Sequence, residues 1–311
     1  MTLAIPSPIQ SLDLTCFKQK NIQVEIKRDD VIDPIISGNK FRKLQGHLAD
    51  YQRGDFSGFI SMGGPWSNHL HALAKVCYDS KLPLVCLIRG PEPKTYSQAL
   101  VDITNWGARL VFLTRAEYRE LREAYISNKI SETETLKSYD KHYFLPEGGY
   151  GQQAMVGIEA LANELPSDYD YIYLGVGTGT TMAGLINAYR GTATKIMGIL
   201  ALKAGNSQSE TIKRLCPEPK HSWQLYDDFV GSGFAQSSHE LETFMAHIYN
   251  EVALITEPVY TAKALYGLCQ HIDKSVIQRD SKVLFLHTGG LQGLRGYSSE
   301  TCRKLAIAAG F

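Results

Sequence analysis

The stretch from residue 171 to residue 189 reads YIYLGVGTGTTMAGLINAY. An apolar run typical of a buried strand passes into a loop rich in glycine and threonine, and this loop opens a helical pattern. The exposed backbone N–H groups of such a loop and the N-terminus of the following helix together form a site for an anion. The stretch therefore predicts an α/β unit with an anion-binding loop. A purely structural turn between strand and helix is the alternative.

The same alternation of short apolar runs and helical patterns extends in both directions from this stretch. Most of the apolar runs end in polar or glycine-containing turns, and a helical pattern then follows. Strands that alternate with helices of about 10–15 residues indicate βαβ units and parallel sheets that are covered by helices on both faces. The predicted strands are residues 22–26, 59–62, 84–88, 109–113, 142–145, 169–174, 195–200 and 283–287.

Length and composition exclude several classes of protein. The 311 residues correspond to about two domains of roughly 150 residues each. The 32 Lys+Arg and 32 Asp+Glu give a net charge of zero, so no global field attracts nucleic acid or an anionic membrane. No stretch reaches the ~20 apolar residues that a membrane-spanning helix needs. We expect neither a nucleic-acid partner nor a membrane partner.

The cysteines and the N-terminus indicate a cytoplasmic protein. The six cysteines are widely spaced, and none has the spacing of a zinc site, so reduced thiols and no metal are expected. The first 14 residues lack the basic and apolar regions of a signal peptide. The chain is therefore expected to remain in the cytoplasm.

Lys40 is the first candidate for catalytic chemistry. It lies in the segment SGNKFRKL, residues 37–44, where a Gly-Asn turn precedes a helical pattern. The positive end of the helix and partial burial would both favour the neutral amine. A lysine with a lowered pKa is what Schiff-base chemistry needs. An ordinary solvated lysine in the first turn is the alternative.

Three further segments place polar residues at the ends of apolar runs, where the ligands of α/β proteins gather. In the first of them, Ser67 precedes a helical pattern, so it is either a helix cap or part of a binding turn. The other two segments are equally compatible with ordinary loop chemistry. The three segments are SMGGPWSNH at 61–69, EPVYTAKALYG at 257–267 and VLFLHTGG at 283–290.

Together these segments resemble the 1-aminocyclopropane-1-carboxylate deaminase and D-cysteine desulfhydrase family. The motifs GNKxRKL, SNH, a Gly/Thr loop, PVYTxKA and HTGG occur there in the same order, and the resemblance covers about residues 12–297. It implies the cofactor pyridoxal 5'-phosphate (PLP), a small amino-acid substrate and a homodimer. It also implies the α/β fold type II of PLP enzymes, which is tryptophan synthase β-like, with two three-layer α/β/α domains and mostly parallel sheets. Residues 1–45 plus 161–311 would form the large PLP-binding domain, and residues 46–160 the small domain.

The resemblance also implies roles for individual residues. Lys40 matches the lysine that is joined covalently to the PLP aldehyde. Ser67 matches a serine that contacts substrate, and Tyr260 matches a tyrosine placed for proton transfer or carboxylate binding. The remaining expected cofactor contacts are Lys43, Gly177, Thr178, Gly179, Thr180 and Thr181 at the phosphate, Asn68 beside the pyridine ring and its 3-hydroxyl, and Thr261 and Thr288 as partners for the ring nitrogen.

Two of these positions divide the family by substrate. Deaminases have glutamate directly after the PVY tyrosine and leucine in the terminal motif, whereas desulfhydrase-like members have threonine at both, as Thr261 and Thr288 are here. A carboxylate keeps the pyridine nitrogen protonated and strengthens the electron sink, and opening a cyclopropane needs that help. The resemblance therefore implies β-elimination of a D-cysteine-like substrate to a keto acid and ammonia. Ring opening of 1-aminocyclopropane-1-carboxylate to 2-oxobutanoate and ammonia is the alternative.

The chain departs from this family mainly around the substrate. Gly233-Phe234-Ala235 stands where relatives often carry Gly-Tyr-Gly, and Phe234 cannot transfer a proton. These changes indicate a reshaped substrate pocket around an intact cofactor site. The other departures are Trp66 in place of glutamine, His71 and Ala72 in place of an Arg-Gln pair, and Thr180 in place of a loop glycine.

Two hypotheses from other classes also remain. One is a dinucleotide-binding oxidoreductase with Gly175–Gly179 as its fingerprint, although no acidic residue follows about 20 positions on. The other is a catalytically idle PLP-binding carrier or regulator, which the replacement at Phe234 would permit.

Overall fold

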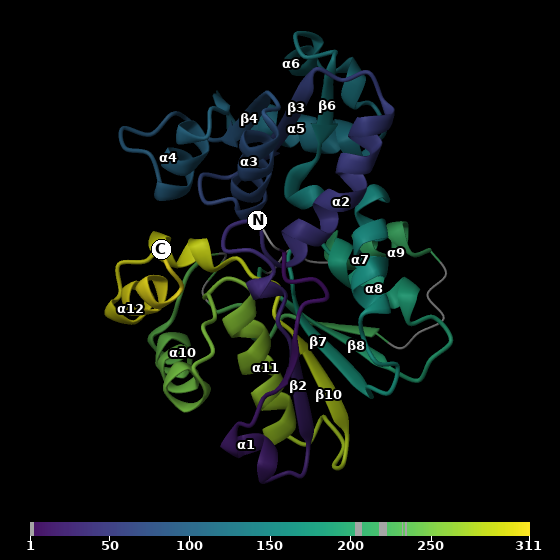
Figure 1. Ribbon diagram of the computed structural model, residues 1–311, viewed down its shortest axis with the longest axis vertical. Helices are drawn as coiled ribbons and strands as arrows, with labels where there is room; N and C mark the ends of the chain where they lie inside the picture. The colour runs from purple at the N-terminus through teal and green to yellow at the C-terminus, as the bar shows by residue number, and fades with distance from the viewer. Residues whose placement is uncertain (1–2, 203–206, 218–222, 232, 234) are drawn as a thin grey trace.

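The computed structural model describes residues 3–202, 207–217, 223–231, 233 and 235–311, and Figure 1 shows that they form two lobes. Each lobe is built around one sheet, and the two sheets have no strand in common. Among the residues so described, no helix combines the length and the apolar character that crossing a membrane requires.

The small lobe contains a four-stranded, fully parallel sheet in the order β5-β4-β3-β6. Helices α3 and α4 cover one face, together with Leu44 of α2, and α5 and α6 cover the other. The strands are β3 (Gly58–Gly63), β4 (Leu84–Arg89), β5 (Arg109–Leu113) and β6 (His142–Leu145).

The large lobe contains a six-stranded sheet in the order β1-β2-β10-β7-β8-β9, in which only the β1–β2 pair is antiparallel. Successive residues of β7 enter opposite cores: Tyr171 and Tyr173 face α1 and α11, whereas Ile172 and Leu174 face α7, α8 and α9. The strands are β1 (Ile9–Ser11), β2 (Gln23–Lys27), β7 (Tyr171–Val176), β8 (Lys195–Leu200), β9 (Trp223–Tyr226) and β10 (Lys282–Leu286).

Helices cover both faces of both sheets, which confirms the predicted three-layer α/β/α architecture. The α-helices are α1 (Thr15–Lys18), α2 (Gly38–Arg53), α3 (Asn68–Ser80), α4 (Gln98–Asn105), α5 (Arg115–Ile126), α6 (Glu134–Lys137), α7 (Gln153–Asn163), α8 (Thr180–Ala188), α9 (Ser207–Leu215), α10 (His239–Val252), α11 (Thr261–Asp273) and α12 (Glu300–Ala308). Short 3-10 helices are η1 (Asp29–Val31), η2 (Ile130–Glu132), η3 (Glu147–Gly149) and η4 (Leu291–Gly296).

The chain passes between the lobes through α2 and returns through α7. These helices approach closely because a Cβ atom on Gly46 would lie 1.8 Å from the Gln153 carbonyl oxygen, and one on Gly157 would lie 1.7 Å from that of Arg42. All four strands of the smaller sheet fall within the predicted small domain, residues 46–160. The boundaries themselves lie inside α2 and α7 and stay a prediction.

A buried ion network fastens α2 to the large lobe. The Arg42 guanidinium lies 2.8 Å from Asp29 Oδ1 and 2.5 Å from Glu164 Oε1, and Lys27 Nζ lies 2.6 Å from Glu164 Oε2. The Arg42 and Asp29 side chains are each 1% exposed, so neither charge can be hydrated if its partner is lost.

We expect Arg42→Met to lower the free energy of unfolding by about 3–5 kcal/mol, because it leaves the Asp29 carboxylate buried without its cation. Arg53→Met is the matched control, because Arg53 belongs to the same helix but its ion pair with Asp50 is exposed, and such pairs contribute about 0–1 kcal/mol. Chemical denaturation of the two variants checks this. Equal effects would contradict a structural role for the buried network.

Candidate active site

The site lies where the connections of two adjacent parallel strands leave the large sheet on opposite faces. β7 leads into α8 on one face, whereas β10 leads into η4 and α12, which pack with α10 and α11 on the other. Ligands of open α/β sheets bind at the carboxyl end of the strands at such a switch point. The predicted Gly/Thr loop follows β7 and the HTGG motif follows β10, so these two motifs are brought side by side.

The turn that carries Lys40 is fixed to the HTGG motif by backbone contacts. The Asn39 N–H donates to the Thr288 carbonyl oxygen at 3.2 Å. Gly38 has φ +63°, and a Cβ atom there would lie 1.9 Å from the same oxygen, so this position needs glycine. Lys40 therefore begins α2 directly beside the carboxyl end of β10.

Two lysines of α2 point into the site. Lys40 Nζ donates to Asn39 Oδ1 at 2.8 Å, and Lys43 Nζ donates to the Gly148 carbonyl oxygen at 3.0 Å and to Thr178 Oγ1 at 3.4 Å. Burial lowers the pKa of Lys40 to about 8, against the opposing effect of Glu257. Burial, and next the charge of Lys40, hold the pKa of Lys43 well below its usual value. The predicted desolvated lysine is thus present, together with a second one.

Two histidines add to this buried basic cluster. Burial lowers the pKa of His47 to about 4, and burial followed by the charges of Lys40, His47 and Lys43 places the pKa of His69 well below its usual value. Ser61 Oγ donates to the Leu145 carbonyl oxygen at 2.6 Å, so it accepts from His69 Nε2 at 2.9 Å. The His69 Nδ1 atom is buried and has no hydrogen-bond partner among the residues that the structure describes. Four buried basic groups, three of which also have their pKa lowered by a neighbouring basic group, form a site that an anion would stabilise.

The Gly/Thr loop faces this cluster. Gly179, with φ +86°, is the N-cap of α8, and no side chain of the described residues binds the N–H groups of the first turn. Thr178 Oγ1 lies 3.2 Å from Thr180 Oγ1, and Asn39 Nδ2 donates to Thr181 Oγ1 at 3.2 Å. The structure therefore brings the loop of residues 177–181 together with Lys43 and with the turn of Lys40.

The PVYT segment lies against the same loop. A Cβ atom on Gly175 would lie 2.9 Å from the Tyr260 carbonyl oxygen, and one on Gly177 would lie 3.0 Å from Tyr260 Cε1. Because Gly175 and Gly177 have no side chains, the Tyr260 backbone and ring can lie directly against the loop. Burial, followed by the charge of Glu257, raises the pKa of the Tyr260 phenol, so Tyr260 keeps its proton at neutral pH.

Glu257 is a residue whose importance the sequence reasoning missed. Its side chain is fully buried, and its two carboxylate oxygens accept the N–H groups of Val259, Tyr260 and Thr261, each at 2.8 Å. Thr261 Oγ1 accepts the Glu257 N–H at 2.9 Å and donates to Glu257 Oε1 at 3.3 Å. The available signal was a carboxylate four residues before Thr261 at the start of a helix. The hydroxyl of Thr261 is consequently held inside this turn.

Asn68 and Ser67 come from the small lobe, at the start of α3. Ser67 Oγ accepts the Leu70 N–H at 3.2 Å, so it caps the helix, which was the alternative interpretation of this residue. Asn68 faces the large lobe, where a Cβ atom on Gly290 would lie 2.7 Å from Asn68 Nδ2. Gln292 Nε2 donates to Asn68 Oδ1 in a short hydrogen bond.

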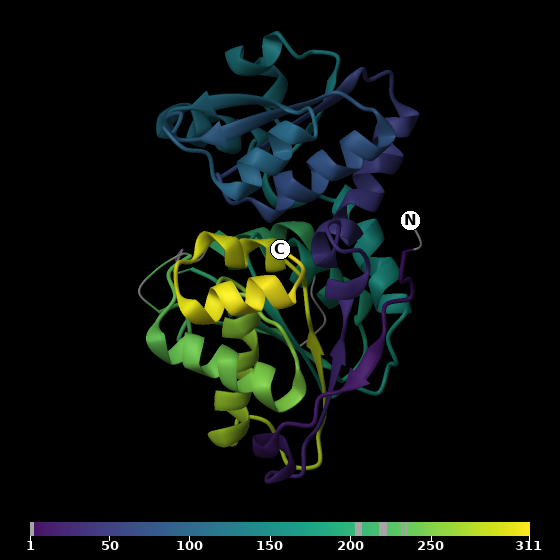
Figure 2. The same cartoon turned by 60° about the vertical axis from the view of Figure 1, so that its left-hand side comes forward.

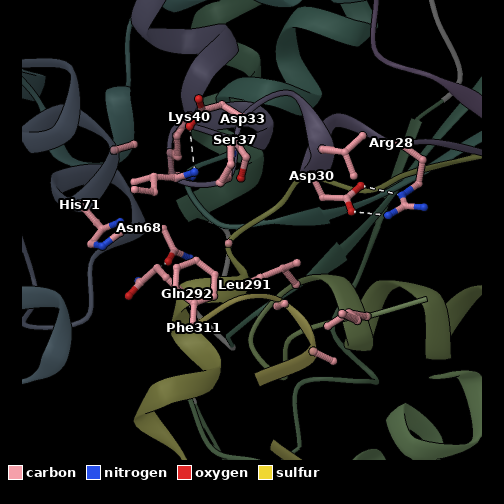
Figure 3. Close-up of a pocket in the computed structure, with 18 of the residues that line it drawn as sticks. Arg28, Asp30, Asp33, Ser37, Lys40, Asn68, His71, Leu291, Gln292 and Phe311 are labelled. Atoms are coloured by element: carbon pink, nitrogen blue, oxygen red, sulfur yellow. Dashed lines mark hydrogen bonds and ion pairs between the residues drawn. The ribbon is translucent and has the colours of Figure 1, made fainter. Parts of the chain in front are cut away.

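A cavity of about 360 Å³ lies beside Lys40, between the lobes (Figure 3). Polar side chains from both lobes line it, and Figure 3 shows Lys40, His71, Asn68 and Gln292 on one side of it and the Arg28–Asp30 ion pair on the other. The predicted departure at Phe234 lies outside the described residues. Nowhere in the described ranges do three or more His, Cys, Asp or Glu side chains gather as a metal site would require.

Comparisons with known proteins agree with this geometry. The family model for "Pyridoxal-phosphate dependent enzyme" matches residues 2–289. A provisionally assigned 1-aminocyclopropane-1-carboxylate deaminase of Thermotoga maritima is 29% identical over 93% of this chain and 95% of its own length. The bifunctional, mitochondrial D-cysteine desulfhydrase/1-aminocyclopropane-1-carboxylate deaminase of Arabidopsis thaliana is 28% identical over 93% of this chain and 77% of its own length.

Among solved structures, the crystal structure of an ACC deaminase homologue superposes with a TM-score of 0.81 at 26% identity and covers 97% of this chain and 93% of that one. The predicted type II, tryptophan synthase β-like fold and the predicted cofactor PLP are confirmed. The match also favours PLP over the dinucleotide alternative. The chain belongs to the pyridoxal-phosphate dependent enzyme family.

Proposed function

We propose that the protein is a PLP-dependent lyase that removes the β-substituent of a small, D-cysteine-like amino acid and releases a keto acid and ammonia. The observation that carries this proposal is the arrangement after Tyr260. The buried carboxylate of this turn, Glu257, is bound to three backbone N–H groups, and the next position is Thr261. No carboxylate follows Tyr260 to stabilise a protonated ring nitrogen, so the site favours a reaction with a good leaving group on Cβ.

The residues of the site fit the parts of PLP. The cofactor phosphate would be held by Lys43, the Thr178 hydroxyl and the N–H groups at the start of α8. These groups form an anion site next to the cluster of buried bases. Lys40 would bind the aldehyde, and Asn68 the ring oxygen. We assign the ring nitrogen to Thr288, because the Thr261 hydroxyl is engaged by Glu257. The buried, unpartnered Nδ1 of His69 offers one further acceptor beside the two lysines.

Bound PLP supplies an electron sink that stabilises negative charge at the substrate Cα. The chain supplies the proton transfers. The lowered pKa of about 8 gives Lys40 a larger neutral fraction near neutral pH than a solvated lysine has, so Lys40 Nζ can take the Cα proton. The Cα electron pair then forms a Cα–Cβ double bond while the Cβ–S bond breaks and its electron pair leaves with sulfur, and water hydrolyses the unsaturated product to keto acid and ammonia. Tyr260, still protonated, would donate a hydrogen bond to the substrate carboxylate or a proton to the leaving sulfur.

Cyclopropane ring opening is the second candidate, because the names of both curated relatives include that activity. The two reactions differ in product: D-cysteine yields pyruvate, sulfide and ammonia, whereas 1-aminocyclopropane-1-carboxylate yields 2-oxobutanoate and ammonia. A homodimer is also part of the proposal, since the family resemblance implies it.

We expect the PLP-loaded protein to release keto acid from D-cysteine faster than from D-serine or from the cyclopropane amino acid. Side-by-side assays of keto acid, with sulfide measured in parallel, check this expectation, and the Lys40→Ala protein serves as the blank. Turnover of the cyclopropane compound alone would refute the argument from Thr261. Cofactor binding without turnover of any of the three would favour an idle carrier or a different amino acid.

A further inference from the structure

A chain of polar contacts runs from Asn68 into the interface between the lobes. Gln292 of η4 donates from Nε2 to Asn68 Oδ1, and Arg295 donates to Gln292 Oε1 at 3.2 Å. The Arg295 guanidinium also donates to Asp102 Oδ2 of α4 at 2.7 Å, and His71 Nε2 lies 2.9 Å from the same oxygen. Figure 2 shows η4 and α12 at the face of the large lobe that is turned toward the small lobe.

The direction of each hydrogen bond in this chain follows from Arg295, which meets one end of the Gln292 amide, and from the Trp66 carbonyl oxygen, which meets the other. An arginine side chain has donors only, so the atom of Gln292 that meets Arg295 must be the oxygen Oε1. The other end of the same amide is then the donor Nε2, which also donates to the Trp66 carbonyl oxygen at 3.4 Å, and of the two ends of the Asn68 amide it can bond only to the oxygen. The Asn68 amide is thereby left with its donor, Nδ2, pointing away from Gln292.

The Nδ2 end of the Asn68 amide points into the site. Gly290 leaves space there, since a Cβ atom on it would lie 2.7 Å from Asn68 Nδ2, and Asn68 lines the same cavity as Lys40. A donor at this point suits an acceptor such as the negatively charged ring oxygen of PLP, whereas Oδ1 at the same point would repel it. An asparagine alone has no preference between these two orientations of its amide.

We propose that Arg295 is a positioning residue that acts through Gln292 to fix the direction of the Asn68 amide, so that Nδ2 donates into the cofactor site. This inference rests on the proposed place of Asn68 beside the cofactor ring. Arg295 is itself held by Asp102 and its guanidinium lies 5.0 Å from the centre of the Phe311 ring. Asp102 belongs to the small lobe, so the orientation of the Asn68 amide depends on the contact between the two lobes.

The deciding variant is Gln292→Glu. The new carboxylate still accepts from Arg295, but it has no donor for Asn68 Oδ1, so the Asn68 amide turns around and presents Oδ1 to the site. We expect PLP to bind about tenfold more weakly. We also expect the spectrum of the bound cofactor to shift toward the shorter-wavelength form in which the ring oxygen is protonated. Titration with PLP, followed by absorbance across pH, measures both effects without any substrate.

Arg295→Lys and Arg295→Met form the matched pair. Lysine keeps a donor for Gln292 Oε1, so its PLP affinity should stay within about threefold of the wild type, whereas Met leaves the Gln292 amide oriented only by its 3.4 Å contact with the Trp66 carbonyl oxygen and should shift affinity and spectrum toward those of Gln292→Glu. Arg303→Met is the control for loss of a positive charge on the neighbouring helix α12, where Arg303 is exposed. If Gln292→Glu does not fold, the comparison of Arg295→Lys with Arg295→Met tests the inference instead.

The outcomes separate the inference from the proposed function. A wild-type protein that shows no cofactor band would overturn the proposed function itself. A wild-type protein that binds PLP, with Gln292→Glu unchanged in affinity and spectrum, would overturn the positioning role of Arg295 alone. Equal behaviour of Arg295→Lys and Arg295→Met would also overturn it, because a merely structural contact does not depend on which end of Gln292 is bound.

Discussion

Replacing Lys40 with alanine is expected to abolish the visible absorbance band of the PLP-treated protein and to reduce keto acid release by roughly a thousandfold or more. The expected loss is this large because the same amine has two tasks in the proposed mechanism. It binds the cofactor aldehyde, and it takes the Cα proton. Its position at the start of α2, held by the Gly38–Thr288 contact, is not available to any other lysine of the turn.

The measurement combines the absorbance spectrum with borohydride reduction, which fixes the cofactor covalently to the amine that carries it. Mass analysis of the reduced protein should then place the label on Lys40. The control is Lys195→Ala, which removes an exposed lysine of the same lobe and should leave band and turnover unchanged. A label that survives in the Lys40→Ala protein on another residue, Lys43 above all, would show that the assignment of Lys40 is wrong.

The pH dependence of this covalent attachment is part of the same expectation. Burial lowers the pKa of Lys40 to about 8, so the neutral, reactive amine is scarce below that pH and dominant above it. The rate at which the band develops after PLP is added should therefore rise as the pH passes through about 8. A rate that rises only near the ordinary lysine pKa of about 10.4 would indicate a solvated amine.

The sequence predicts the buried strands of the fold but not its exposed edge strands. The eight strands expected from apolar runs are all present, with ends that differ by at most two residues. The two strands that the pattern missed, β1 and β9, are the edge strands of the larger sheet. Ile9–Ser11 and Trp223–Tyr226 are largely exposed or only half-buried, so they lack the apolar run by which a buried strand is recognised.

For the site, the motifs predicted what each turn contains but not how the turns meet. The anion loop and the desolvated lysine were both inferred from local patterns. The contact of Lys43 with the Gly148 carbonyl oxygen joins residues 105 positions apart, and that of Gln292 with Asn68 joins residues 224 positions apart. Such pairs depend on how the two lobes pack, which no local pattern contains. The capture of the Thr261 hydroxyl by Glu257 was missed for a different reason, since a threonine at a helix start suits a cap and a cofactor contact equally well.

Replacing Lys43 with methionine is expected to weaken PLP binding about 100-fold, and the physical reason is the phosphate. In the structure, burial and next the charge of Lys40 hold the pKa of Lys43 well below its usual value, so the charged amine is disfavoured there. A bound phosphate favours the charged amine and returns the pKa toward its ordinary value. Lys43 lies at the phosphate end of the proposed site because its Nζ contacts Thr178 Oγ1 at 3.4 Å.

The sign of the linked pH dependence follows from these two states. Between the lowered pKa of Lys43 in the absence of phosphate and its raised pKa with phosphate bound, binding takes up a proton, so the affinity of that step must fall as the pH rises. Calorimetry with inorganic phosphate, in two buffers of different ionisation enthalpy, measures the number of protons taken up. Inorganic phosphate has no aldehyde, so Lys40 cannot react with it. The uptake should fall more in Lys43→Met than in Lys40→Ala, since Lys43 is assigned to the phosphate and Lys40 to the aldehyde. Equal proton uptake by the wild type and Lys43→Met would show that the phosphate is held elsewhere.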